Sequence, residues 1–323
     1  MAYMAAETPP KPSAGVSTNS PSNAAAAKAG KHKASPNDLV EREYEKLIER
    51  DEKTLNEVNT LVKDADAFAE KGAPTPKAVL AAKIDALLDP IRKSYEDFLK
   101  EHPEHVDARL AYGSFLNETG DTEEAIKQWE KARETDPKNP SSWNNLANIY
   151  GHIGPVKKAF EYYEKAIELD PTEPVYFQNM ATTVYLFRKD AMEMYRINEE
   201  QVFNKSLDLY KVAMKLDPTN LALATDYAQS FYGIKPMRVD DALAAWNHAL
   251  TLAKNDVEKE GIYLHLARVE LNSGKFSEAQ KHLDLVNNPE MQDLKKRLQK
   301  NLTQKKNGEV EKEKSPSSAK PSP

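Results

Sequence analysis

Seven histidines and many carboxylates are the side chains of this sequence that could do chemistry. Only His102 and His105 lie close together, in the segment EHPEH, where Glu101 and Glu104 flank them. Two imidazoles and two carboxylates would suit a divalent transition metal. Residues of this kind in a turn are more often simply solvated, and we favour that interpretation.

Motifs for other kinds of chemistry are missing from the sequence. Cysteine is absent, which excludes disulfides, thiolate zinc sites and a cysteine nucleophile. There is no glycine-rich phosphate loop after a strand, no HExxH and no GxSxG. We therefore predict a protein that is not an enzyme and that binds neither a cofactor nor a metal. No apolar run reaches the roughly 18 residues of a membrane span.

The net charge of −6 is distributed unevenly. Residues 1–37 hold four Lys and one Glu, and residues 295–323 hold nine Lys or Arg and three Glu, which leaves 32 basic and 47 acidic side chains for 38–294. The ends, 1–37 and 303–323, have few large apolar residues, so we predict that both are disordered. They lack interleaved aromatics and the middle is acidic, so we predict no nucleic-acid partner. Contact of Lys295–Lys306 with an anionic surface is the alternative.

Between these ends the sequence has helical periodicity. Residues 38–71 predict one long helix that stops before Gly72, with apolar residues three or four positions apart and a polar interruption at Asp51. We favour a helix that packs against the segment that follows it. The alternative is a coiled-coil dimerisation helix, and the Ala-rich end of the stripe argues against it.

A repeat of 34 residues organises the rest of the chain, from the segment beginning at Val106 to the one beginning at Pro140. The Pro140 segment resembles the tetratricopeptide repeat family at its signature positions: Trp143, Leu146, Ala147, Tyr150, Gly154, Ala159, Tyr163, Ala166 and Pro171. Small residues such as Ala147 and Ala159 allow the two helices of a hairpin to touch, and Pro171 ends the second helix. The Val106 segment matches as well, apart from Arg109, which stands where a bulky apolar residue is expected.

Extending this spacing gives an array over 72–302. We predict units near 72–105, 106–139, 140–173, 174–220 with an insertion, 221–259, and 260–302 with a cap. In the degenerate first unit, Thr75–Pro76 and Asp89–Pro90 predict the starts of two helices. Apolar residues on one face after the last unit predict a capping helix: Met291, Leu294, Leu298 and Leu302.

The resemblance implies an all-α fold, a right-handed α-solenoid of antiparallel helix pairs, here with a long N-terminal helix and a C-terminal capping helix. It also implies a concave groove, lined by the first helix of each pair, that binds an extended peptide or a partner helix. Family positions that face this groove give a peptide-binding set of Asn144, Asn145, Asn148, His152, Gln178, Asn179, Tyr185, Gln229 and Arg268. Further positions of the same kind are Asp107, Leu110, Ala111, Ser114, Asn117, Ser141, Val175, Thr182, Thr225, Asp226, Tyr232, Leu264, His265 and Leu271.

Two details refine this expectation. Chaperone-binding members of the family need Lys and Arg at such positions, whereas this chain has Leu110, Ser114 and mostly amides, so a chaperone C-terminus is not the expected ligand. Asn145 and Asn179 occupy equivalent positions in adjacent units, and an amide can pair with both the N–H and the C=O of a peptide backbone. We keep two interpretations of these residues: a short asparagine ladder of this kind, or ordinary solvated amides.

The insertion between Leu186 and Phe203 is the least family-like segment. It carries apolar residues, and Asn198 with Gln201 resembles a helix start with its capping partner. We predict that it lengthens both helices of its unit and packs against them. Contact with a partner is the alternative for these side chains, and it is compatible with packing.

We therefore predict a non-enzymatic protein–protein interaction scaffold, monomeric and soluble, whose partner is an unidentified protein or peptide. One alternative is an organiser at a cell surface or envelope, tethered by the basic ends or by an export signal missing before Met1. A second alternative is an enzyme with an unrecognised site. We favour a cytoplasmic location over a periplasmic or secreted one, in which the signal would be truncated.

Overall fold

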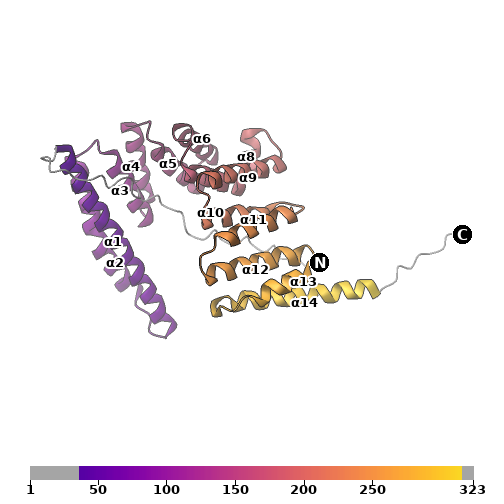
Figure 1. Ribbon diagram of the computed structural model, residues 1–323. Coiled ribbons are helices and arrows are strands. Elements are labelled where there is room, and N and C mark those ends of the chain that lie inside the picture. Colours follow the sequence, from indigo (N-terminus) through magenta and orange to yellow (C-terminus); the bar gives the residue numbers. More distant parts are fainter. Residues whose placement is uncertain (1–35, 315–323) are drawn as a thin grey trace, which may run out of the picture. The chain divides into compact units, whose positions relative to one another are not determined.

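The computed structural model describes residues 36–314, and every regular element within that range is a helix. The predicted disordered segments fall mostly outside it, over 1–35 and 315–323. The chain divides into two compact units, one up to Ser142 and one from Trp143 onward. Figure 1 labels their helices along the chain.

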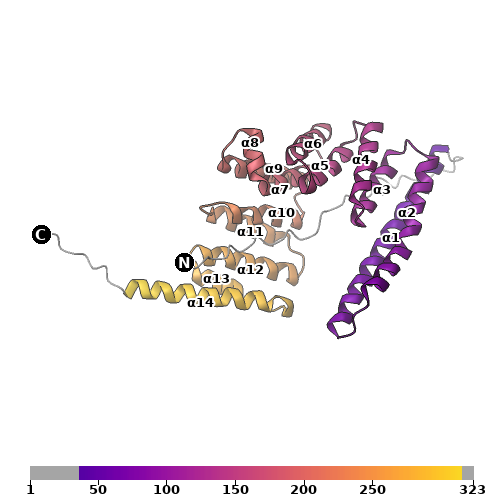
Figure 2. The ribbon, with the colours of Figure 1, turned by 180° about the vertical axis from the view of Figure 1, so that it is seen from behind.

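The first unit consists of two helix pairs. Its helices are α1 (Pro36–Glu70), α2 (Lys77–Glu101), α3 (Val106–Glu118) and α4 (Thr122–Thr135). The helices α1 and α2 lie side by side in both Figure 1 and Figure 2, and α3 packs on α4. Burial of Tyr44, Leu47, Leu88 and Tyr95 joins α1 to α2, so the prediction that the long first helix packs against the segment after it is confirmed.

The predicted helix break at Asp89–Pro90 is wrong, because α2 runs unbroken through Pro90. A proline inside a helix costs about 3 kcal/mol, since it lacks an N–H and crowds the preceding turn. Leu88, Ile91 and Tyr95 are buried on one face around it, and each buried side chain of this size contributes about 1.5–3 kcal/mol. Burial along one continuous face therefore outweighs the proline, and 72–105 does not form a helix pair.

The second unit continues the helical pairs. Its helices are α5 (Pro140–Ile153), α6 (Val156–Leu169), α7 (Pro174–Leu186), α8 (Arg188–Tyr195), α9 (Glu199–Leu216), α10 (Leu221–Ser230), η1 (Phe231–Gly233), α11 (Val239–Leu252), α12 (Asp256–Asn272), α13 (Phe276–Asp284), η2 (Pro289–Met291) and α14 (Gln292–Lys314). Ala147 of α5 and Ala159 of α6 are fully buried in one cluster with Tyr163, as close helix contact requires. The helix pairs α10–α11 and α12–α13 pack on each other in Figures 1 and 2, and α14 lies along α13. The all-α fold predicted from the repeat is confirmed for the described residues.

The insertion differs from its prediction in one respect. The helix α7 ends at Leu186 without being lengthened, and the inserted residues form the separate short helix α8. The second helix of the unit, α9, is lengthened, and the predicted capping box of Asn198 and Gln201 begins it. Ala191 is fully buried, and Phe187 and Met192 are among the residues that pack beside it, so the predicted packing is confirmed.

The capping helix α14 follows the last pair, with Leu298 and Leu302 buried against α12 and α13. It continues past Thr303 to Lys314, so the prediction that disorder begins at Thr303 is wrong. Lys305 helps to hold this stretch, because its Nζ donates to the Leu271 carbonyl (3.4 Å) and to Asn272 Oδ1 (3.2 Å). The repeat boundaries proposed from the sequence remain a prediction.

Candidate functional site

The predicted groove residues of the second unit lie on the first helices of its pairs, α5, α7, α10 and α12, with Tyr232 in η1. The structure sorts them into an amide cluster on α5 and α7, a Gln178–Asp226 pair, and a hollow between α10 and α12. His152 is exposed at the end of α5 and joins none of these. Tyr185 packs against Phe203, with ring centroids 5.9 Å apart.

The amide cluster differs from the expected ladder. Asn179 Nδ2 donates to Asn144 Oδ1 (3.0 Å), and Asn144 Nδ2 donates to Asn145 Oδ1 (3.4 Å). Asn148 Oδ1 accepts from the hydroxyl of Tyr163. Asn145 and Asn179 are thus linked through the buried Asn144, and a part of their hydrogen-bonding capacity is used within the protein. Their role in gripping a peptide backbone stays a prediction.

A second polar contact joins α7 to α10. Gln178 Nε2 donates to Asp226 Oδ2 over 2.8 Å. Burial raises the pKa of Asp226, and the bond from Gln178 acts in the opposite direction. This carboxylate is therefore engaged inside the protein instead of facing a ligand.

A hollow of about 510 Å³ opens between α10 and α12. Both helices pack on α11, and Trp246 of α11 lines the hollow together with His265 of α12. The walls are formed by Leu221, Ala222, Thr225 and Gln229 of α10 and by Val257, Glu258, Gly261 and Ile262 of α12. Ala222 and Gly261 are the small residues of the two walls, Gln229 and Glu258 are polar, and the volume falls within the roughly 300–1,000 Å³ of ligand pockets.

The aromatic side of the hollow is held rigidly. The His265 ring stacks on Trp246 with centroids 4.1 Å apart and planes 6° apart. His265 Nδ1 lies 3.1 Å from the hydroxyl of Tyr232. The guanidinium of Arg268 lies over the Tyr232 ring, 4.9 Å from its centroid. Burial, with Arg268 nearby, lowers the pKa of His265 to about 4, so this imidazole is neutral at neutral pH.

Thr225, Gln229 and His265, three of the predicted groove residues, line this hollow. Sequence reasoning missed Trp246, Gly261 and Glu258 as residues of the same hollow. Gly261 carries a signal that could have been used, because a glycine inside a helical pattern commonly marks a close approach or an open space.

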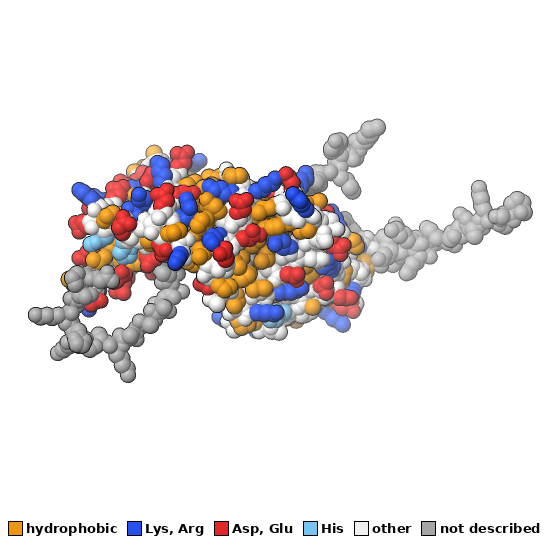
Figure 3. Space-filling view, turned by 90° about the horizontal axis from the view of Figure 1, so that it is seen from above, with side chains coloured by type: hydrophobic (Ala, Val, Ile, Leu, Met, Phe, Trp, Pro, Cys, Tyr) orange, Lys and Arg blue, Asp and Glu red, His pale blue; other side chains and the backbone are white. Residues whose placement is uncertain are grey.

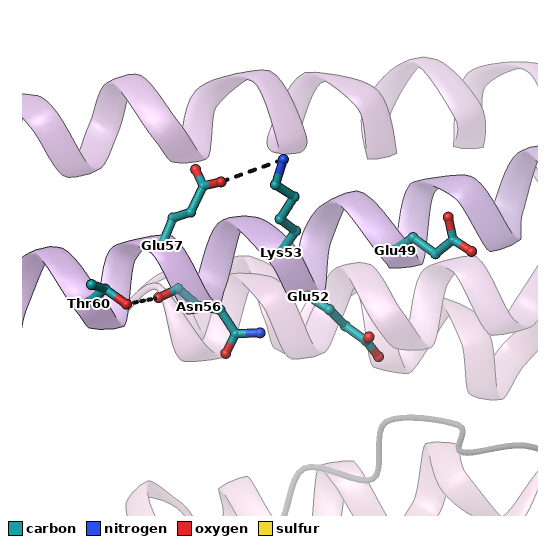
Figure 4. A pocket seen from close by; sticks show the side chains of 6 residues that line it. All are labelled: Glu49, Glu52, Lys53, Asn56, Glu57 and Thr60. Carbon is teal, nitrogen blue, oxygen red and sulfur yellow. Dashed lines mark hydrogen bonds and ion pairs between the residues drawn. The ribbon is translucent and has the colours of Figure 1, made fainter.

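Two other candidate sites have weaker structural support. Figure 4 shows six side chains on α1: Glu49, Glu52, Lys53, Asn56, Glu57 and Thr60. Lys53 Nζ and Glu57 Oε1 are 3.8 Å apart, and Thr60 Oγ1 donates to the Asn56 carbonyl (2.9 Å). All six residues are exposed on one helix, so this is an open, solvated face. Figure 3 likewise shows acidic and basic side chains interspersed over the face in view.

The side chains of His102 and His105 make structural contacts. His105 Nδ1 accepts the backbone N–H of Ala108 (3.1 Å) and so caps α3. Its ring lies 4.8 Å from that of Tyr44, and His102 Nε2 is 3.9 Å from Glu43 Oε2. Across residues 36–314, no three His, Asp or Glu side chains gather as metal ligands would. Over the same residues, no helix is long and apolar enough to span a bilayer.

Part of the chain matches models of a known protein family. Two family models of tetratricopeptide repeats match, described as TPR repeat over residues 113–154 and as tetratricopeptide repeat over 140–173. A search of curated proteins gives no match.

Solved structures with a similar fold include YrrB, a TPR protein with an unusual peptide-binding site (15% identity, 67% of this chain and 99% of that chain, TM-score 0.48). Others are TTC0263 of Thermus thermophilus (21%, 61% and 99%, 0.44) and pilF of Pseudomonas aeruginosa (12%, 71% and 90%, 0.47). All three TM-scores are below 0.5, so the assignment rests on the two sequence matches and on the helix pairs that carry them. Residues 113–173 of this chain therefore consist of tetratricopeptide repeats.

Proposed function

We propose that this protein is a scaffold that binds an extended peptide or protein segment in the groove along the first helices of its second unit. Tetratricopeptide repeats suggest protein–protein interaction, and the hollow between α10 and α12 supports the finer assignment. It offers apolar or small residues on both walls, among them Leu221, Ala222 and Val257, and an exposed amide at Gln229. Such a combination suits a side chain anchored beside a hydrogen-bonded backbone.

Site-specific cross-linking tests this proposal. A photoreactive phenylalanine analogue would be placed at Gln229, which lines the hollow, or at His248, which is exposed on α11. We expect a discrete cross-linked product, identified by mass spectrometry, from Gln229 and none of that kind from His248. Equal cross-linking from both positions would show that the groove is not the binding face.

Two threonines give a matched pair of variants for the same experiment. Thr225 on α10 and Thr251 on α11 each donate from Oγ1 to a carbonyl three residues earlier, over 2.8 and 2.6 Å. Only Thr225 lines the hollow. We expect Thr225→Trp to abolish the cross-link from Gln229 and Thr251→Trp to leave it unchanged.

Neither a surface-tethered organiser nor an enzyme is favoured by these observations. That the chain is not an enzyme, that it is a monomer without a nucleic-acid partner, and that it is cytoplasmic all stay predictions. The residues Asn144, Asn145, Asn148 and Asn179 are proposed as secondary contacts of the same peptide.

A further inference from the structure

The helix α12 carries a cation, Arg268, one turn after His265 of the hollow. Arg268 is exposed and lies three residues after His265, so both side chains project from the same face of α12. Its guanidinium is supported by the ring of Tyr232, whose hydroxyl contacts His265. An arginine laid on an aromatic ring is partly desolvated and has little freedom left to lose when it binds an anion.

Three carboxylates of α10 and α12 have hydrogen-bond partners other than Arg268. Asp226 accepts from Gln178, and Glu258 Oε2 accepts the backbone N–H of Lys254 (2.6 Å). Glu270 is buried, with Oε2 2.8 Å from His282 Nδ1. Among the described residues Arg268 has no ion pair, and the residue is exposed.

The hollow and the cation together define a ligand. The hollow takes a bulky apolar group against Leu221, Val257 and the neutral ring of His265, which stacks on the fully buried Trp246. The cation takes a carboxylate at one end of that hollow, about one helical turn (~5.4 Å) beyond His265. An acid and a large apolar side chain a few residues apart in an extended peptide would occupy both positions.

We propose that the site between α10 and α12 recognises a peptide segment in which a large apolar or aromatic side chain fills the hollow and a nearby carboxylate pairs with Arg268. This deepens the proposed function and rests on it. The planar guanidinium binds the two carboxylate oxygens side by side, which gives the peptide one direction along the groove.

Selection of random peptides by the full chain tests the proposed ligand class. A display library of random peptides would be selected on the wild type, on Arg268→Glu and Arg268→Gln, and on Thr225→Trp. The matched control is Arg297→Glu, an exposed arginine on α14. Circular dichroism would confirm that each variant keeps its helix content.

From the wild type and from Arg297→Glu, we expect peptides with Asp or Glu a few residues from Phe, Trp, Tyr, Leu or Met. Arg268→Gln should lose the preference for acid, Arg268→Glu should exchange it for Lys or Arg, and Thr225→Trp should lose the preference for the bulky residue. Replacing the acid of a selected peptide by its amide should weaken wild-type binding about tenfold.

The outcomes distinguish a failure of this inference from a failure of the proposed function. Enrichment of a motif without an acid, or an acid preference that survives in Arg268→Glu, would overturn the ligand class and leave peptide binding in the groove intact. Enrichment of no peptide by any variant would count against groove binding itself. Enrichment that is indifferent to Thr225→Trp would place the binding face elsewhere.

Discussion

A buried carboxylate in the first unit gives the sharpest stability prediction. Asp51 of α1 is only 8% exposed, and the hydroxyl of Tyr95 donates to its Oδ2 over 2.6 Å. Its other oxygen, Oδ1, has no hydrogen-bond partner. Burial raises the pKa of Asp51 from 3.8 to about 6, and the bond from Tyr95 opposes that rise. Folding therefore favours the protonated form.

The magnitude follows from that shift. A pKa difference of about 2 units between the folded and unfolded states corresponds to about 3 kcal/mol of unfolding free energy. Because the folded pKa is the higher one, Asp51 lowers stability as the pH rises from about 4 through about 6. Asp51→Asn keeps an acceptor for Tyr95 and removes the charge. We expect it to raise the unfolding free energy by about 3 kcal/mol near pH 7.5 and by only about 1 kcal/mol near pH 4.5.

Urea denaturation followed by circular dichroism, over a series of pH values, measures this difference. The matched control is Glu49→Gln, because Glu49 is exposed on the same helix, its substitution removes the same charge, and it is not among the carboxylates that raise the pKa of Asp51. We expect it to change stability by no more than about 0.5 kcal/mol at any pH. A gain for Asp51→Asn that is equal at both ends of the pH series, or a loss near pH 7.5, would refute the reasoning. Carbon NMR of the Asp51 carboxyl gives its pKa directly.

Two further predictions concern packing and capping. A methyl group at Gly113 of α3 would clash with the indole of Trp129. Gly113→Ala should therefore lower the unfolding free energy by about 1–3 kcal/mol in thermal or urea unfolding. A methyl group at Gly151 would make only ordinary contacts, so Gly151→Ala should be neutral or slightly stabilising. Asn198→Ala removes the side chain that accepts from Gln201 N (2.9 Å) at the start of α9; we expect a loss of about 1 kcal/mol, and unchanged stability would show that the capping box does not hold this helix.

The repeat made most of the fold predictable, because its constraints are local. Ala147 and Ala159 must be small wherever two helices touch, and Gly120 and Gly274, at φ +95° and +79°, permit the turn between helices of a pair. Such positions recur at fixed spacing. A reader of the sequence can therefore place the helix pairs without knowing what they contact.

Where local signals and burial disagreed, the sequence misled. Pro90 follows Asp89, a pair that ordinarily starts a helix, yet the buried face around it keeps α2 continuous. Leu186 and Phe187 show the reverse case. Nothing in their types marks the end of α7, which is set by how α8 folds back on α6 and α9. Both errors arise because the deciding contacts come from residues distant in the chain.

The candidate site was still less accessible, because its chemistry depends on side chains that family positions treat separately. Asn145 and Asn179 were paired by position alone, and only coordinates reveal that Asn144 stands between them. Arg268 was predicted as a groove residue, but its contact with the Tyr232 ring, on which the proposed role depends, is visible only in the structure. A cation in such a groove is available to a ligand only where no anion of the protein pairs with it. The order of residues along the chain does not show that pairing.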